Sequence, residues 1–364
     1  MQWQKLIIPP ELKPDWFEGD SVRLPLASGI RPPAVRGGEQ GCVFNFDVEP
    51  VIEALRQESY APPMTSPALG IPFPYHRLPA WLRLLAARCI YLPKRLFRHR
   101  HDPPWPIAAS ADLLLALSGR FPSLSWGGKW AVTITHDVDT RAGLALCPKI
   151  AELVEGFGFR SCFYIVGEVI MSDPGIVREL HERGHEIGSH DLYHDNRLCF
   201  LEQQAMEDRL QRARDTIRPY NGVGFRSPSL LRSPEMLTAV GRHFRYDSSI
   251  CDTDLEFDRG CTTVFPYHLK GLLEIPVTMP MDSSLLYTGH SPAAILQLWR
   301  EKCEYIRKTG GLAVLLTHAE PHLGGKKSGL GCLGEFLGWL RDQPDTAMVL
   351  PAEIKAQFKS GGLK

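Results

Sequence analysis

The chain has 364 residues, of which 44% are hydrophobic and 23% charged, an ordinary composition for a globular protein. Its 41 basic and 41 acidic side chains balance, so its charge does not indicate nucleic acid or an acidic polymer as a partner. No stretch approaches the ~20 consecutive apolar residues of a membrane-spanning helix. The N-terminus, interrupted by Pro9 and Pro10, does not read as a secretory signal. The nine cysteines are scattered and include no C-x-x-C pair, which favours reduced thiols and a cytoplasmic location.

The first part of the chain, residues 1–125, is predicted to be an irregular α+β extension to a domain formed by residues 126–364. Prolines recur in it at intervals that long helices cannot accommodate. Residues 43–54 predict a short strand followed by a helix, with Asp47 and Glu49 as the acids of the helix start.

Residues 78–101 mix large apolar side chains with many arginines. One interpretation is a helix that packs on the next domain with its basic end in water. The other is a peripheral anchor on the inner face of a membrane. Pro93 interrupts the helix before most of the charge arrives, which favours packing.

Regular alternation of strands and helices begins at Trp130. The strand-like segments are Ala131–Thr135, Ser161–Val166, His185–Ser189, Gly222–Arg226, Arg245–Ser248, Leu272–Met279, Leu312–Thr317 and Ala347–Leu350. The helix-like segments are Gly143–Gly156, Pro174–Arg183, Leu201–Arg218, Pro234–Val240 and Pro292–Lys308, and the second, fourth and fifth have Asp173, Ser233 and Ser291 as N-caps. This repeated order predicts a parallel sheet closed, or nearly closed, into a barrel.

Three polar side chains, His136, Asp137 and Asp139, end the first of these strands. Side chains alternate along an extended chain, so the two carboxylates can point together while His136 points the other way. Two converging carboxylates need a cation or a strong donor beside them. The alternative is that one caps the following helix and the other is solvated.

His190 and His194 follow the third predicted strand with the spacing i, i+4, which puts both imidazoles on one side of a helical turn. Two imidazoles and the carboxylate of Asp139 suit Zn²⁺ and leave a coordination position open. The alternative, if that carboxylate is not a partner, is a pair of solvated loop histidines.

Arg226, Asp247 and His318 stand at the ends of three further predicted strands. In an α/β barrel the carboxyl ends of all strands meet at one rim, where active sites lie. Arg226 and Asp247 could form a buried contact that holds Asp137, although Arg226 alone reads as a surface charge and Asp247 alone as a strand-end acid. His318 is a candidate proton donor, with a core histidine as the alternative. His136, Glu320 and His322 are left without a role.

Five motifs in this order resemble the polysaccharide deacetylases with a NodB-type domain, carbohydrate esterase family 4, over about residues 128–350. The motifs are Thr135–Asp139, His190–His194, Arg226–Pro228, the Asp247 motif and Leu315–His318. The resemblance implies a deformed (β/α) barrel of the NodB type.

The resemblance also implies roles: Asp137 as the base, His318 as the acid, Arg226 orienting Asp137, Asp247 supporting Arg226, and Asp139, His190 and His194 as metal ligands. The sequence departs from the family at His136, Asp191 and Ser229 and lacks a Trp after Asp247. The missing aromatics bear on a polymer-binding groove more than on the chemistry.

The predicted function is metal-dependent hydrolysis of an N-acyl group, with N-acetyl favoured, on an amino sugar. A lipid- or nucleotide-linked precursor of a surface glycan is the favoured substrate. The alternatives are hydrolysis of another C–N bond, such as a cyclic amide, and a saccharide-binding module without catalysis. The sequence does not predict an oligomeric state.

Overall fold

The computed structural model describes residues 2–26, 34–38, 41–65, 103–255 and 258–354, together with Leu85 and Cys89. Apart from those two residues, the segment 78–101 lies outside the described part, so its predicted anchor stays a prediction. Within the described residues we find no helix with the length and hydrophobicity needed to cross a membrane.

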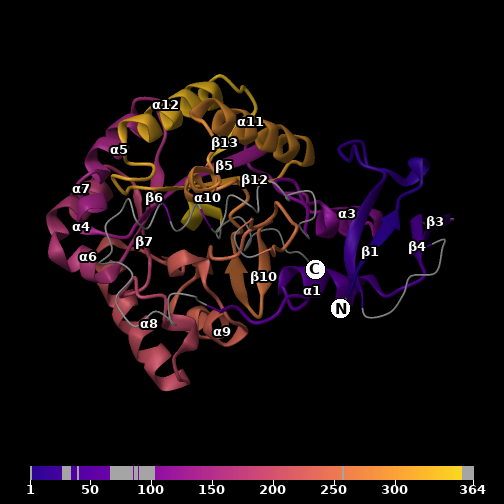
Figure 1. Cartoon of the computed structure of the whole chain (residues 1–364), viewed down its shortest axis with the longest axis horizontal. Helices are drawn as coiled ribbons and strands as arrows, with labels where there is room; N and C mark the ends of the chain where they lie inside the picture. Colours follow the sequence, from indigo (N-terminus) through magenta and orange to yellow (C-terminus); the bar gives the residue numbers. More distant parts are fainter. Residues whose placement is uncertain are drawn as a thin grey trace.

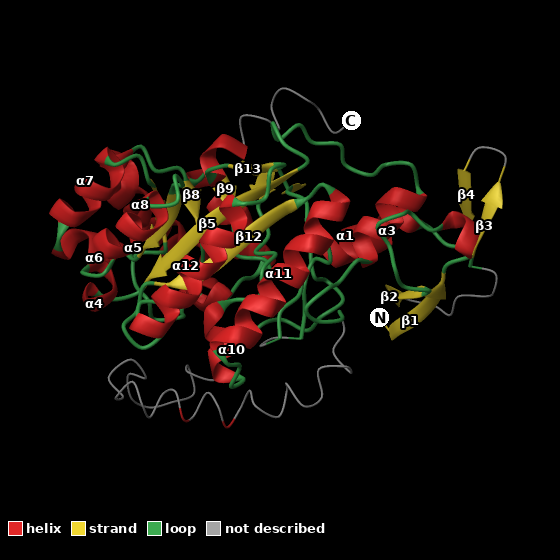
Figure 2. Cartoon of the chain, turned by 90° about the horizontal axis from the view of Figure 1, so that it is seen from above, coloured by secondary structure: helices red, strands yellow, loops and turns green. Residues whose placement is uncertain are grey.

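The N-terminal region lies at one end of the molecule (Figures 1 and 2) and has a hydrophobic core of its own. Its elements are the antiparallel pairs β1 (Gln2–Ile7) with β2 (Ser21–Leu26) and β3 (Val35–Gly38) with β4 (Gly41–Phe44), and the helices α1 (Val48–Arg56) and α3 (Ser110–Leu117). The side chain of Asp47 caps α1 by accepting from the Glu49 amide, as expected of an acid at a helix start. The domain boundary near residue 125 stays a prediction.

The rest of the chain forms one curled sheet in the order β10-β11-β9-β8-β7-β6-β5-β12, and β13 pairs with the first half of β5. The strands are β5 (Trp130–Val138), β6 (Ser161–Ile165), β7 (Glu186–Ser189), β8 (Gly224–Phe225), β9 (Tyr246–Asp247), β10 (Tyr267–Leu269), β11 (Leu272–Glu274), β12 (Leu312–His318) and β13 (Thr346–Met348). Their pairings are parallel except that of β10 with β11, which is a hairpin.

Helices cover the outside of this sheet (Figure 1). They are α4 (Arg141–Leu144), α5 (Cys147–Glu155), α6 (Gly167–Ser172), α7 (Pro174–Glu182), α8 (Gln203–Ile217), α9 (Pro234–His243), α10 (Asp282–Tyr287), α11 (Pro292–Thr309) and α12 (Lys327–Arg341). The predicted N-caps Asp173, Ser233 and Ser291 each accept a hydrogen bond from a first-turn amide. The fold is thus the deformed α/β barrel that the sequence predicts.

Alternation along β5 sorts its side chains between the two faces of the sheet. Trp130, Val132 and Ile134 belong to the large core under the helices, whereas Ala131 packs in the barrel interior. Asp137 has the same parity as Ala131. The alternation therefore places Asp137 on the interior face of the sheet, near the carboxyl end of β5.

The predicted strand at Leu272–Met279 ends early, at Glu274, but the following segment stays extended. The amide of Met279 donates to the Val314 carbonyl of β12 at 3.1 Å, so this segment bridges the gap between the two ends of the sheet. It thereby carries the chain to α10, a helix that the sequence analysis missed.

The sequence analysis also missed α12, whose glycines argue against a helix. Gly334 and Gly338 face α5 and the turn after it, where a Cβ would make ordinary contacts with Leu153 at 3.5 Å and Phe157 at 3.4 Å. The helix forms because its apolar side chains, among them Leu333, Phe336 and Leu337, are buried in the core.

Candidate active site

The ends of β5, β7, β8 and β12 bring the predicted site residues together. In the parallel register His318 of β12 lies beside Asp137 of β5, and the β7 and β8 strands end at Ser189 and Phe225, one residue before His190 and Arg226. Parallel strands present their carboxyl ends at one edge, so groups scattered over almost 200 residues of sequence share one site.

Asp139, His190 and His194 form a compact triad in which one potential ligand atom of each lies within 4.8 Å of the others. Asp139 Oδ1 is 3.4 Å from His190 Nε2 and 3.5 Å from His194 Nε2. That oxygen is buried and has no hydrogen-bond partner among the described residues. A buried acceptor without a donor, facing two imidazole nitrogens, fits a divalent cation.

The orientation of His190 also suits a ligand. Its Nδ1 lies 2.9 Å from the Arg226 carbonyl, which can only accept, so Nδ1 carries the proton and Nε2 presents its lone pair to the triad. Histidines that bind metal are commonly fixed in this way through the second ring nitrogen. Burial opposes ionisation of His190, but Asp137 and Asp139 outweigh it and raise its pKa.

Asp191 holds the loop that carries the two histidines. It has a left-handed backbone, φ 63°, and its buried carboxylate accepts from Arg209 Nε at 3.0 Å and Nη2 at 2.5 Å. Arg209 also binds the Tyr193 carbonyl and Asp195. Asp191 is therefore part of an ion pair that holds the loop between His190 and His194.

Asp137 is almost fully buried beside the triad, with Oδ2 3.7 Å from His190 Nε2. Arg226 Nη1 donates to Asp137 Oδ1 at 2.9 Å and to Thr135 Oγ1 at 2.8 Å. The guanidinium stacks over the Tyr164 ring, 4.1 Å from its centroid. Burial would lower the pKa of Arg226, but the Asp137 carboxylate raises it, so this cation stays charged.

The expected contact between Asp247 and Arg226 is not found among the described residues. Arg226 donates instead to the carbonyl and hydroxyl of Ser248, both at 2.9 Å. Asp247 accepts from the amide and hydroxyl of Ser249 and faces Glu274, whose pKa is raised well above its usual value by burial and by the Asp247 carboxyl. Asp247 is thus one half of a buried carboxyl pair, and Ser248 supports Arg226.

His318 has a partner that the sequence analysis missed, Asp282 at the start of α10. Its Oδ1 lies 2.7 Å from His318 Nδ1, and its Oδ2 accepts from the His318 amide at 2.9 Å. Burial would lower the pKa of His318, but Asp282 outweighs it and raises the pKa to about 10. The imidazole is therefore protonated at neutral pH, as a general acid must be.

The three residues left without a role lie in different places. Glu320 accepts from the Asp139 and Thr140 amides, both at 3.0 Å, and so fixes the backbone of a triad residue. His136 points to the helix side, where its Nδ1 meets Thr317 Oγ1 at 2.7 Å and burial lowers its pKa to about 3. His322 lies half-buried in the turn after β12.

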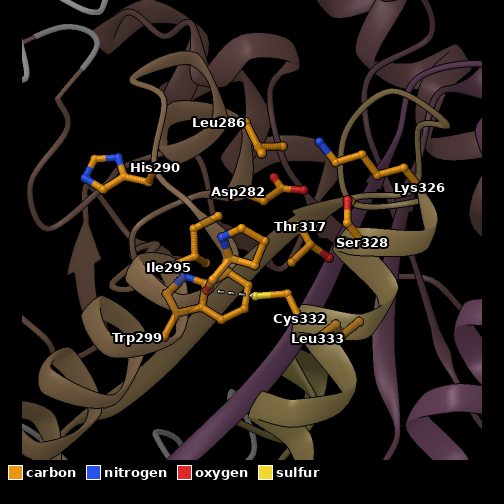
Figure 3. Close-up of a pocket in the computed structure, with 13 residues that line it drawn as sticks. Asp282, Leu286, His290, Ile295, Trp299, Thr317, Lys326, Ser328, Cys332 and Leu333 are labelled. Atoms are coloured by element: carbon orange, nitrogen blue, oxygen red, sulfur yellow. Dashed lines mark hydrogen bonds between the residues drawn. The ribbon is translucent and has the colours of Figure 1, made fainter.

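A cavity of about 210 Å³ lies beside Asp282, between α10, α11 and α12. Figure 3 shows Asp282 and Lys326 at one side of it and Ile295, Trp299 and Leu333 at the other. No residue of the triad lines this cavity, so we assign no reacting group to it.

Comparison with solved structures agrees with this fold. Two proteins described as polysaccharide deacetylases are similar, one from Mycobacterium smegmatis (TM-score 0.54, 22% identity, 65% of this chain and 94% of that chain) and one from Pseudomonas aeruginosa PAO1 (TM-score 0.55, 14% identity, 66% and 95%). An allantoinase is also similar (TM-score 0.53, 13% identity, 66% and 94%). At these identities the likeness establishes the fold alone.

No curated protein sequence matches the chain significantly. Residues 127–242, however, match the family model described as polysaccharide deacetylase. The matched stretch contains Asp137, the triad and Arg226, whereas His318 and Asp282 lie beyond it. Over residues 127–242 the chain is therefore similar to the polysaccharide deacetylase family.

Proposed function

We propose that the protein is a metal-dependent hydrolase that removes an N-acyl group, with N-acetyl favoured, from an amino sugar. The observation that carries the proposal is the pairing of charges around the triad. Asp137 is held by Arg226 and His318 by Asp282, so a base and an acid face one metal site with opposite charges. The family match supports the same chemistry.

The ligands in this proposal are Asp139, His190 and His194, and Zn²⁺ is the favoured ion, since one carboxylate and two imidazoles suit it. When bound, such an ion acidifies the attacking water and polarises the acyl carbonyl.

The side chains of the chain supply the proton transfers. Asp137, buried and fixed by Arg226, accepts the proton of the attacking water. His318 keeps Nδ1 on Asp282, so its Nε2 is the atom that delivers a proton to the departing nitrogen. An amide nitrogen is a poor leaving group as an anion, so the C–N bond breaks only if this proton arrives.

A carrier-linked amino sugar, joined to a lipid or a nucleotide, is the substrate that we propose within this class. The residue usually aromatic after the Arg-Pro motif is Ser229 here, which supports a small saccharide over a finished polymer. The nine free cysteines support the cytoplasm as the proposed compartment, with the inner face of the membrane as the alternative.

The test is mass spectrometry of a panel of N-acyl amino sugars, free and carrier-linked, incubated with zinc-loaded protein. We expect loss of the acyl group from at least one member and no loss after chelation. Unchanged masses throughout, with metal bound, would contradict the proposal.

The fold shared with an allantoinase keeps cyclic-amide hydrolysis as a second candidate. The two candidate functions are distinguished by whether turnover requires a metal and by the product that forms. Ring opening of a cyclic amide that persists in chelated protein would favour the second candidate. Tight saccharide binding without turnover by the metal-loaded protein would favour a binding module.

A further inference from the structure

The N-terminal region reaches the barrel through the turn that follows α1. Glu58 lies in this turn with a left-handed backbone, φ 53°, and is 5% exposed. Tyr60 joins the same contact, since its hydroxyl accepts from the Gly260 amide at 2.7 Å. The carboxylate of Glu58 is thus buried against the barrel by an ordered backbone.

Glu58 binds Arg232 with both oxygens. Arg232 Nε donates to Oε2 at 2.7 Å and Nη2 donates to Oε1 at 2.5 Å, and Arg232 is 4% exposed. Bidentate arginine–carboxylate pairs fix the plane of the guanidinium as well as its charge. The pair with Glu58 therefore also fixes the orientation of the remaining nitrogen, Nη1.

That nitrogen, Nη1, holds two segments of the barrel rim. It donates to the Leu230 carbonyl at 2.6 Å and to the Ser249 carbonyl at 3.0 Å. Leu230 belongs to the turn after Arg226, in which Ser229 and Leu230 both have left-handed backbones, φ 52°. Such conformations cost energy and persist when surrounding contacts enforce them.

The same two segments form the immediate surroundings of Arg226. The amide of Ser227 donates to Ser249 Oγ at 2.9 Å, and Arg226 donates to the carbonyl and hydroxyl of Ser248. Arg226 in turn binds Asp137. An unbroken series of buried contacts therefore leads from Glu58 to the base.

We propose that Glu58 is a positioning residue of the active site. By holding Arg232 it fixes the turn 227–231 and the backbone of Ser248 and Ser249, and so sets the orientation of Arg226 toward Asp137. The N-terminal region is then part of the catalytic apparatus and not a separate module. The inference rests on the proposed function for its kinetic consequence, but its structural consequence is measurable without turnover.

The kinetic test compares Glu58→Gln, Arg232→Met and the double variant in zinc-loaded, full-length protein. Glu58→Gln leaves the buried Arg232 unpaired and should lower the melting temperature, which the double variant recovers in part because it removes this pair of charges but leaves Arg259, 4.0 Å from Glu58, without the carboxylate. We expect kcat to fall about 10²-fold in all three, as for other small misplacements of a catalytic group, with KM nearly unchanged. Recovery of kcat together with stability in the double variant would overturn the proposal.

A second variant covers the case in which the double variant does not fold. Arg232→Lys keeps the charge pair but lacks the planar fork that reaches Leu230 and Ser249. It should retain most of the stability and still lose kcat. The matched control is Glu18→Gln, which breaks the exposed Lys308–Glu18 pair between the same two regions and should change neither quantity.

Hydrogen exchange tests the same inference without a substrate. In Glu58→Gln, peptides covering residues 226–232 and 248–250 should exchange faster than in the wild type, while 312–318 should not change. Unchanged exchange at the two rim segments, or a uniform increase over the barrel, would contradict the positioning role. If the wild type turns over no member of the panel, the proposed function fails while this measurement still decides the inference.

Discussion

Each side of the site pairs an ionisable side chain with an opposite charge, and the signs of the two pairs are reversed. On one side a carboxylate, Asp137, lies beside the cation of Arg226; on the other an imidazolium, His318, lies beside the anion of Asp282. The base is almost fully buried and the side chain of the acid is 15% exposed. The comparison teaches that each group has beside it a charge that favours the ionised form, which the proposed roles of base and acid require.

Of the substitutions that test this comparison, removal of His318, the proposed acid, should lower activity most. General-acid contributions are ~10²–10⁴-fold, so His318→Gln should lower kcat/KM by about that factor and flatten the alkaline limb of the pH profile. The measurement is a pH series of initial rates, with His322→Gln as the control. A limb that persists in His318→Gln and disappears in His322→Gln would assign the acid to His322.

Weakening the acid without removing it should have a smaller effect. Asp282 raises the pKa of His318 to about 10. Asp282→Asn removes that cause, so the pKa should fall and the alkaline limb should move to lower pH. We expect a loss of about 10–100-fold at neutral pH, the range for carboxylates that orient site histidines. An unmoved limb would mean that Asp282 does not control the acid.

The loop of the triad offers a test on the metal side. Asp191→Asn breaks the charge pair with Arg209 and should weaken zinc affinity by about 10–100-fold. Competition with a chromogenic chelator measures it. The control is Asp208→Asn. Asp208 lies next to Arg209 in α8 and accepts an exposed hydrogen bond from Gln204, so this variant should bind zinc as the wild type does. If the two variants bind zinc with equal affinity, the Asp191–Arg209 ion pair does not control the placement of the zinc ligands.

The smallest effect is expected at His136, which departs from the aromatic usual in the family. It is buried on the helix side against Phe163, and burial lowers its pKa to about 3. His136→Phe removes the partner of the buried Thr317 hydroxyl, so it should lower the free energy of unfolding by about 1–3 kcal/mol and leave kcat near the wild-type value. Denaturant titration and steady-state rates check this. A large loss of kcat would indicate that His136 takes part in the active site.

Much of the site could be predicted because its residues follow strands. Asp137, Asp139, His190 and His194 stand in short motifs after hydrophobic segments, and the rule that parallel strands end at one edge brings them together. Glu320 was not assigned, because its contact is with the backbone amides of Asp139 and Thr140, which no side-chain pattern encodes.

Asp282 was missed for a different reason. It lies 36 residues before His318 and joins it only because the extended segment after β11 crosses to β12 and leads into a short helix. Asp247, at the end of a predicted strand, was expected to support Arg226, but its side chain pairs with Glu274. The helix α12 was missed because burial of its apolar face in the core outweighs the low helix propensity of its glycines.

The most direct measurement of the central claim separates the two aspartates of β5 and the loop that follows it. Metal analysis and single-turnover deacylation are carried out on Asp137→Asn and Asp139→Ala. Asp139→Ala should lose most bound zinc, because it removes an anionic ligand. Asp137→Asn should keep near-stoichiometric zinc and lose nearly all turnover, because it removes the base and its pairing with Arg226. A metal-free Asp137→Asn beside a loaded Asp139→Ala would exchange the two roles. If both variants stay loaded and active, this rim is not the active site.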